Sequence, residues 1–226
     1  MKLIPILYST EMVRAKQAGR KSMTRRMRGL DVVNKNPGEW LFVGMKDYSR
    51  QNFFCAQFKN ENKTVTIKSP YGQPGDILWT RETWFKSLNM GFVYKADGYN
   101  SPGTTGTHLQ YSPEFVKWKP SIHMPYAACR SWDKLLEVRC ERLKNISEAD
   151  AIAEGIEPEA DGGYKSYQII HSGKHKGTSH PHSILANKFA RISYMELWEA
   201  LNGADSWDEN PWVWVLTFQP TEKPNL

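Results

Sequence analysis

The chain has 226 residues, of which 40% are hydrophobic and 24% charged, a composition that excludes a wholly disordered protein. Thirty Lys and Arg residues against 24 Asp and Glu residues give a net charge of +6, which favours phosphorylated or polyanionic partners. The first apolar run is too short for a signal-peptide core, and no other approaches the roughly 20 residues that span a bilayer. We therefore expect neither export nor membrane insertion.

The N-terminal segment predicts a strand, a helix and a helix stop in succession. Residues 3–8 are apolar and interrupted by a proline, which suits a short edge strand. Ser9 or Thr10 can cap a helix that runs to Ala18. Gly19 can then adopt the left-handed conformation that ends helices. Residues 19–26, GRKSMTRR, should therefore leave the helix as a loop or short extended segment.

The following hundred residues favour β-structure. Runs at 41–45, 52–58 and 64–68, separated by polar turn residues, predict a β-meander. A Pro/Gly turn leads into residues 77–85, ILWTRETWF, whose alternation sets Leu78, Thr80 and Glu82 on one face of a strand. Residues 92–96 predict another strand, and residues 97–113, rich in Gly, Ser, Thr and Tyr, predict an exposed excursion.

The C-terminal part alternates strands and helices. Residues 134–143, KLLEVRCERL, predict a half-buried strand, and Ser147 is expected to cap a short helix that Gly155 closes. Residues 157–183 predict a surface insertion, residues 185–201 an amphipathic helix ending at Asn202–Gly203, and residues 212–218 a final strand. These elements predict one mainly β, α+β domain over residues 1–226, a compact β-barrel with short flanking helices.

Basic residues are concentrated just after the first helix. Seven of them fall within the fifteen residues 14–28, which contain no acidic residue: Arg14, Lys16, Arg20, Lys21, Arg25, Arg26 and Arg28. One interpretation is a solvated helix end whose arginines hold the last carbonyl groups. The alternative is a functional pocket for a nucleobase, a nucleotide or a nucleic acid.

Within this cluster, the pattern Gly19-x-Lys21-x-x-Thr24-x-Arg26 after a short helix resembles the signature of the ASCH domain. That family belongs to the PUA-like β-barrel superfamily. LWTRETW, LEVRCERLKNISEADAIAEGI and SWDENPWVWVLTF are similar to segments of a longer subgroup found in phage and prophage genomes. The resemblance covers most of the chain and implies a PUA-like β-barrel with insertions at about 28–68, 97–115 and 157–183. For a phage or prophage protein, it also implies the cytoplasm of a bacterial host.

The threonine at the sixth motif position is similar to that of small bacterial amidohydrolases that deacetylate N4-acetylcytidine. The resemblance implies Thr24 as nucleophile, Lys21 as general base and Glu154 as the third catalytic group, with no cofactor. Arg26 is expected to hold the substrate or an oxyanion. A lysine can activate a threonine hydroxyl if burial or nearby cations lower its pKa, and Arg20 and Arg25 are such cations. Without the resemblance, Glu154 is better interpreted as a surface residue that pairs with a lysine, and with the resemblance the two interpretations are evenly balanced.

Other polar and aromatic residues have two interpretations each. Glu82 either binds a base edge or pairs with an arginine across the sheet. Trp79, Trp84 and Tyr94 either sandwich a base or pack in the core. Four histidines lie within twelve residues, without clear metal-ligand spacing, and predict a polar loop rather than a metal site: His171, His175, His180 and His182. His123 is interpreted in the same way. Three cysteines fit neither a disulfide framework nor a zinc pair and favour a reducing, cytoplasmic setting: Cys55, Cys129 and Cys140.

Three hypotheses of function follow from the sequence. The first is an amidohydrolase that acts on N4-acylated cytidine or a related modified nucleobase. The second is a non-catalytic ASCH module that binds RNA, single-stranded DNA or a modified nucleotide through the same pocket. The third is a nuclease, for which no metal-binding set is evident. The sequence identifies no protein partner and no oligomeric state.

Overall fold

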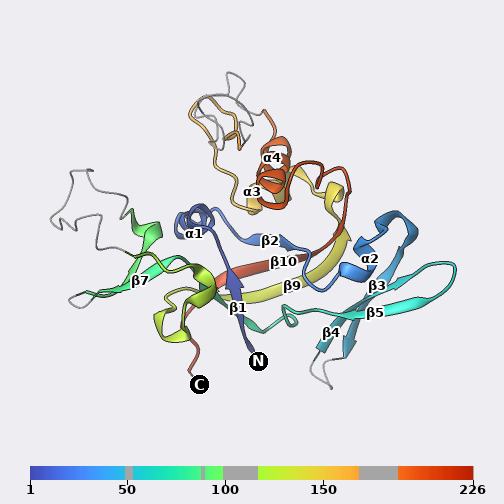
Figure 1. Ribbon diagram of the computed structural model, residues 1–226, viewed down its shortest axis with the longest axis horizontal. Helices are drawn as coiled ribbons and strands as arrows, with labels where there is room; N and C mark the ends of the chain where they lie inside the picture. The colour runs from blue at the N-terminus through green and yellow to red at the C-terminus, as the bar shows by residue number, and fades with distance from the viewer. Residues whose placement is uncertain (49–52, 88–89, 99–116, 168–187, 226) are drawn as a thin grey trace.

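The computed structural model describes residues 1–48, 53–87, 90–98, 117–167 and 188–225. These residues form a mainly β, α+β structure with sheets of five, three and two strands (Figure 1). The excursion predicted at 97–113 lies almost wholly outside the described residues, as does the second half of the insertion predicted at 157–183.

The five-stranded sheet has the strand order β1-β6-β9-β10-β2. Its members are β1 (Leu3–Leu7), β6 (Ile77–Arg81), β9 (Trp132–Arg142), β10 (Trp212–Thr221) and β2 (Met23–Arg26). β1 pairs with β6 in parallel, and the other neighbours are antiparallel. The prediction of an N-terminal edge strand is therefore confirmed.

The predicted closed barrel is wrong, because the sheet ends at β1 on one edge and at β2 on the other. A closed barrel needs a continuous backbone ladder between its first and last strands. β1 contains Pro5, which has no N–H to donate, and β2 is only four residues long. A side chain spans the two edges instead: Arg26 Nη2 donates a hydrogen bond to the Leu7 carbonyl at 2.8 Å.

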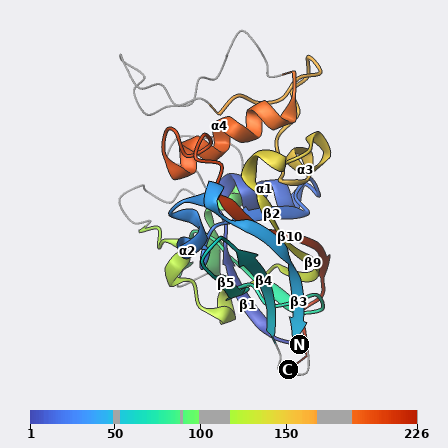
Figure 2. The same cartoon turned by 90° about the vertical axis from the view of Figure 1, so that its right-hand side faces the viewer.

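The meander predicted in the first half of the chain forms the three-stranded antiparallel sheet. It consists of β3 (Leu41–Tyr48), β4 (Phe53–Lys59) and β5 (Thr64–Lys68). One face packs on the main core through Phe42, Met45, Phe54, Val65 and Ile67. Figure 2 shows β3 running down the side of the molecule that faces the viewer.

The strand predicted over residues 77–85 is two strands. β6 ends at Arg81, and β7 (Trp84–Ser87) then pairs with β8 (Gly91–Tyr94) in the two-stranded sheet. The break occurs at Glu82, whose backbone N–H donates to Met124 Sδ at 3.1 Å rather than to a neighbouring strand. The predicted inward face is confirmed, since Leu78, Thr80 and Glu82 are all buried.

Helix caps follow the sequence signals closely. In α1 (Thr10–Gln17), Ser9 Oγ accepts from the Met12 N–H at 3.3 Å. In α3 (Glu148–Ala153), Ser147 Oγ accepts from the Asp150 N–H at 3.1 Å. A further short helix, α2 (Asp31–Asn34), precedes β3. The last helix, α4 (Ala190–Asn202), ends at Gly203 as predicted but begins at Ala190, and residues 185–187 of its predicted start lie outside the described residues.

We expect Ser147→Ala to lower the free energy of unfolding by about 1 kcal/mol, because the Asp150 N–H loses its cap acceptor. Urea unfolding measures this value. A change near zero would mean that water replaces the serine hydroxyl at no cost. The prediction matters for the site described below, because Glu154 directly follows the last residue of α3.

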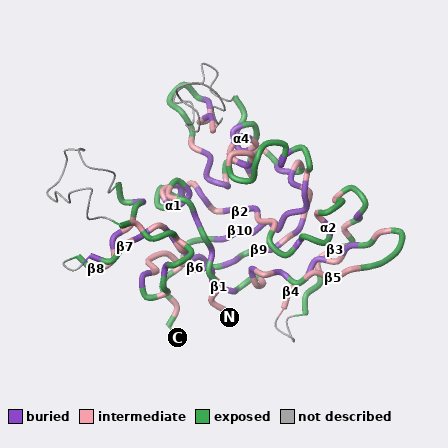
Figure 3. Tube along the Cα trace, viewed as in Figure 1, coloured by how far each residue is buried: buried purple, intermediate pink, exposed green. Residues whose placement is uncertain are grey.

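Two apolar clusters cover opposite faces of β10. Trp214, Leu216 and Phe218 pack with Tyr8 and the inner face of β3–β5, whereas Val213 and Val215 pack with α3 and α4. The tube in Figure 3 is accordingly coloured as buried along β10 and β2. In the part of the chain that the structure describes, no helix has both the length and the apolar character needed to cross a membrane.

Candidate functional site

The GRKSMTRR segment leaves α1 and becomes an edge strand. Gly19 has a φ of +71°, and the Arg20 N–H donates to the Ala15 carbonyl at 2.9 Å. Lys21 then forms an isolated antiparallel bridge with Glu154, and the Ser22 N–H donates to the Ala153 carbonyl at 2.9 Å. The predicted short extended segment is confirmed, and it lies directly against the C-terminal end of α3.

Lys21 and Glu154 form a buried ion pair. Lys21 Nζ donates to the Glu154 backbone carbonyl at 2.6 Å and to Glu154 Oε2 at 3.0 Å. Lys21 is only 5% exposed and Glu154 only 3%. Burial lowers the pKa of Lys21; the Glu154 carboxylate opposes this change, and the charges of Arg26 and Lys16 add to it. Lys21 is therefore more easily deprotonated than a surface lysine.

Arg25 occupies the other oxygen of Glu154. Its Nη1 lies 3.3 Å from Glu154 Oε1, and its Nη2 lies 2.7 Å from Glu141 Oε1 and 2.6 Å from Asp150 Oδ2. Burial lowers the pKa of Arg25, but the surrounding carboxylates outweigh burial and hold the pKa above its ordinary value. Three carboxylates thus engage the Arg25 guanidinium, and Arg139 joins the same network through Asp150 at 2.8 Å.

Thr24 and Arg26 lie on the opposite face of β2 from Met23 and Arg25. Met23 packs with the α3/α4 cluster, and strand alternation turns Thr24 toward the side of Tyr8. Thr24 is 3% exposed. The Arg26 guanidinium lies 5.4 Å from the centre of the Tyr8 ring, and Lys21 Nζ lies 5.6 Å from it. Among the described residues no hydrogen bond joins the Thr24 hydroxyl to Lys21 or Glu154, since Lys21 Nζ donates to Glu154.

A cavity of about 230 Å³ lies near this cluster. Its lining residues come from α1, the segment after β6, the segment before β9, and both β9 and β10: Val13, Lys16, Gln17, Glu82, Arg130, Ser131, Asp133 and Pro220. Lys16 pairs with Asp133 and donates to Thr80 Oγ1 at 2.7 Å and to Ser131 Oγ at 2.9 Å. Lys16 Nζ also lies 5.4 Å from the centre of the Tyr8 ring, so Lys16 at the cavity wall and Lys21 both lie close to this ring.

Sequence reasoning did not single out Asp133, and it placed Lys16 only within the basic cluster. Burial raises the pKa of Asp133, and the Lys16 ammonium opposes that rise. Two signals in the sequence could have identified the pair. Asp133 falls in the inward register of β9, two residues before the buried Leu135, and Lys16 lies at helical spacing from the buried Met12 and Val13.

Glu82 pairs with an arginine, as one of its two interpretations predicted. Arg130 Nε and Nη2 each lie 2.9 Å from a Glu82 carboxylate oxygen, in a two-point contact. Arg130 also reaches Asp97 at 2.7 Å, and its guanidinium lies 3.9 Å from the centre of the Tyr94 ring. The partner arginine lies in the loop before β9 rather than across the sheet, and both members of the pair line the cavity.

The aromatic candidates are not among the residues that line this cavity. Trp84 is buried with Met124 and Ala128, and Trp79 contacts the edge of the Tyr126 ring at 5.3 Å between ring centres. The hydroxyl of Tyr94 donates to the Ala128 carbonyl at 2.6 Å. Arg20, the remaining predicted binding residue, is half-buried at the turn after α1. These contacts favour packing for the two tryptophans.

The described residues contain no group of three His, Cys, Asp or Glu side chains arranged to hold a metal ion. His123 is exposed in a 3-10 turn, and the predicted polar loop with the four other histidines named above lies outside the described residues. All three cysteines are free.

The site brings together an amine, a carboxylate, a hydroxyl and a guanidinium within one buried cluster. A buried amine of lowered basicity contacts a carboxylate, a buried hydroxyl follows three residues later, and a guanidinium lies two residues beyond it. A polar cavity opens beside the Tyr8 ring. Comparison of the chain with protein-family models, with curated proteins and with solved structures found no match.

Proposed function

We propose that this protein is an amidohydrolase that removes an acyl group from the exocyclic N4 of an acylated cytidine or a related modified nucleobase. The observation that carries the proposal is the buried Lys21–Glu154 pair, in which burial lowers the pKa of Lys21. Thr24 lies three residues further along the same segment and is buried as well. The resemblance of GRKSMTRR to the ASCH signature supports this assignment, as it supports a bacterial cytoplasm as the place of action.

The reaction that we propose proceeds through a covalent acyl-enzyme. Lys21, as the neutral amine, turns from Glu154 and takes the proton of the Thr24 hydroxyl while Thr24 Oγ1 attacks the acyl carbon. The tetrahedral intermediate collapses, the bond from the acyl carbon to N4 breaks, and Lys21 returns the proton to N4. Water then hydrolyses the ester on Thr24 and releases the carboxylic acid. Arg26 stabilises the oxyanion, and Glu154 orients Lys21 and balances its charge.

We propose that the base binds in the cavity lined by Lys16, Glu82, Arg130 and Asp133. The polar edge of cytosine presents a donor and acceptors, and this cavity offers both carboxylates and cations to them. The Tyr8 ring links this cavity to the reacting groups, since Lys16 in the cavity wall and Lys21 both lie close to it.

We expect Thr24→Val to lower kcat for N4-acetylcytidine on the order of 10³-fold or more, because valine keeps the shape of threonine but removes the hydroxyl. Thr24→Ser should retain activity. Lys21→Met should lower kcat by about 10²- to 10⁴-fold. In the wild type the rate should rise with pH and reach half its maximum below the ordinary pKa of lysine, because burial lowers the pKa of Lys21. Chromatography of the released cytidine measures these rates.

The loss of activity in Thr24→Val is informative only if this variant stays folded. Circular dichroism and urea unfolding show whether Thr24→Val stays folded. Equal rates for Thr24→Val and Thr24→Ser would contradict the nucleophile role, and no release of cytidine by the folded wild type would contradict the proposed reaction.

A second candidate is a non-catalytic module that binds a modified nucleotide in the same cavity. The observation that favours it is that Lys21 Nζ is already engaged, because it donates to two oxygens of Glu154. Calorimetric titration with N4-acetylcytidine distinguishes the two functions. Binding without turnover that is lost in Asp133→Asn supports the module, and turnover supports the hydrolase.

A further inference from the structure

The outward face of the three-stranded sheet is basic and carries an aromatic pair. We define this outward face by the polar and aromatic strand residues in the register opposite the core residues: Lys46 and Tyr48 on β3, Phe53, Gln57 and Lys59 on β4, and Thr64, Thr66 and Lys68 on β5; Leu41 and Cys55 fall in the same register. The three lysines are exposed. None of these outward positions carries a carboxylate, because Asp47 falls in the opposite register. Asp47 is exposed on β3 but belongs to the register of the opposite face, so a polyanion on this outward face meets lysines rather than a strand carboxylate.

The aromatic pair offers a stacking platform. The rings of Tyr48 and Phe53 stack with their centres 4.8 Å apart and an interplanar angle of 29°. Lys68 Nζ lies 5.1 Å from the centre of the Phe53 ring. Aromatic rings on a sheet surface beside lysines are the combination by which proteins bind single-stranded nucleic acids, with bases on the rings and phosphates at the cations.

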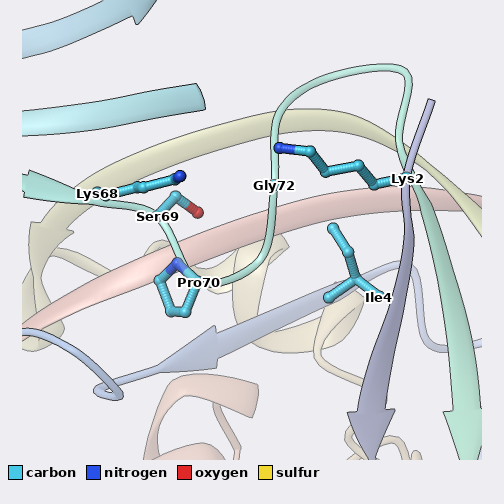
Figure 4. Close-up of a pocket in the computed structure, with 6 residues that line it drawn as sticks. All are labelled: Lys2, Ile4, Lys68, Ser69, Pro70 and Gly72. Carbon is cyan, nitrogen blue, oxygen red and sulfur yellow. The ribbon is translucent and has the colours of Figure 1, made fainter. Parts of the chain in front are cut away.

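A pocket continues this surface beyond the end of β5. A cavity of about 380 Å³ lies between the start of β1 and the segment from β5 to β6, and its polar side chains are Lys2, Lys68 and Ser69. Figure 4 shows the two lysines extending toward each other from opposite sides of the pocket, with the Ser69 hydroxyl between them and below. Two ammonium groups and a hydroxyl are a suitable donor set for a phosphate group.

The loop between β5 and β6, which lines this pocket, packs closely against Ile4 of β1 at Gly72. Gly72 has a φ of +78°, and a Cβ at this position would lie 2.4 Å from both Asp76 Oδ2 and Ile4 Cδ1. Asp76 accepts from the Lys2 backbone N–H at 2.7 Å and from the Gln73 N–H at 3.1 Å. The Asp76 carboxylate beside Gly72 is thus held by backbone donors and is not among the residues that line the pocket.

We propose that the outward face of β3–β5 and the Lys2–Lys68 pocket together bind single-stranded RNA. An unpaired base stacks on the Tyr48–Phe53 pair, an adjacent phosphate enters the pocket, and the strand continues along β4 toward Lys59. The seven residues from Phe53 to Lys59 span about 20 Å, which accommodates several nucleotides. The choice of RNA rests on the proposed function, since its substrate is a ribonucleoside, but the surface is separate from the Lys21–Glu154 site.

The test is fluorescence anisotropy with a labelled, unmodified 12-nucleotide RNA and the full-length protein at several salt concentrations. We expect Phe53→Ala to weaken binding by about 5- to 100-fold, through the loss of one stacked base. Lys68→Gln should weaken binding and reduce the salt dependence, the slope of log K against log salt, by about one phosphate contact. Lys86→Gln is the matched control, because Lys86 is exposed on β7, at the other side of the molecule in Figure 1.

Each outcome decides the proposal. Loss of affinity in Phe53→Ala and Lys68→Gln but not in Lys86→Gln supports it. Equal losses in all three variants, equal affinity for a duplex of the same sequence, or tighter binding of the corresponding DNA overturns it. The RNA carries no acyl group, so its binding is independent of hydrolysis: failure to release cytidine contradicts the proposed function alone, and failure of the face variants to weaken binding contradicts this inference alone.

Discussion

Glu154→Gln is expected to lower the free energy of unfolding by about 3–5 kcal/mol, which is the usual cost of removing one partner from a buried ion pair. The amide keeps the shape of the carboxylate but removes its charge, and its single oxygen can accept from Lys21 or from Arg25 but no longer from both, as the two carboxylate oxygens do. Lys21 is almost inaccessible to water, so its charge cannot be solvated.

The reverse substitution should cost less. In Lys21→Met the carboxylate of Glu154 still faces Arg25 Nη1 at 3.3 Å, so one cation remains beside it. Arg25 in turn has two further carboxylates, Glu141 and Asp150. The double variant Lys21→Met/Glu154→Gln should therefore be more stable than Glu154→Gln alone, and a double-mutant cycle measures the coupling between the two residues.

The deficit of Glu154→Gln should shrink as the pH rises. Burial already lowers the pKa of Lys21 in the wild type, and Glu154 is the partner that opposes this change. Without Glu154 the folded-state pKa falls further below the unfolded value. A lowered pKa costs stability while the group is protonated, and this cost disappears as the pH rises from the folded toward the unfolded pKa.

Urea unfolding at pH 7 and pH 9 measures both effects. Glu157→Gln is the matched control, because Glu157 pairs with Lys165 at 3.2 Å with side chains 47% and 37% exposed, and such a pair contributes less than about 1 kcal/mol. If Glu154→Gln changed stability as little as this control does, water would reach the Lys21–Glu154 pair, and burial could not be the cause of the lowered Lys21 pKa.

Gly155→Ala is expected to lower the free energy of unfolding by about 2–4 kcal/mol, for two reasons that add. Gly155 ends α3 with a φ of +93°, a conformation that costs alanine about 1–2 kcal/mol. The added Cβ would also lie 2.9 Å from Ala15 Cβ and 3.0 Å from Lys21 Cβ, so α1 or the Lys21 segment must shift.

Gly19→Ala separates these two causes. Gly19 has a comparable φ of +71°, but nothing lies within 4 Å of a Cβ added there. Its expected loss is therefore the conformational part alone. Urea unfolding of both variants gives the packing part by difference, and equal losses would contradict the close contact between Gly155 and Lys21. A shift of Lys21 in Gly155→Ala should also move the pH at which the proposed hydrolysis reaches half its maximum rate.

Local features of the structure were predictable because their causes are local. A serine one turn before an amide, as at Ser9 and Ser147, caps a helix through atoms a few residues apart. The alternation at Leu78, Thr80 and Glu82 indicates the buried face before any partner strand is known. The break after Arg81 was not predictable, because it depends on Met124, which is 42 residues away from Glu82.

The candidate site likewise combines residues that the sequence singled out with contacts that only the structure shows. The sequence singled out Lys21, Thr24 and Glu154, the last of them through the resemblance of its helix to a family pattern. The contact between Lys21 and Glu154 joins residues 133 positions apart, and the Lys16–Asp133 pair joins residues 117 positions apart. The positions of the charges in the sequence do not specify these two distant partners. A basic cluster attracts all 24 acidic side chains through the same long-range electrostatic force.

By itself, the sequence determined most of the strands, the serine caps at which α1 and α3 begin, and that a basic segment follows the first helix stop. Only the tertiary structure decided that the five-stranded sheet stays open between β1 and β2, with Arg26 across the gap, and that Lys16 and Lys21 both lie close to the Tyr8 ring. The physical reason is range: caps and alternation act over a few residues, whereas sheet closure and the pairing of buried charges depend on how distant segments pack.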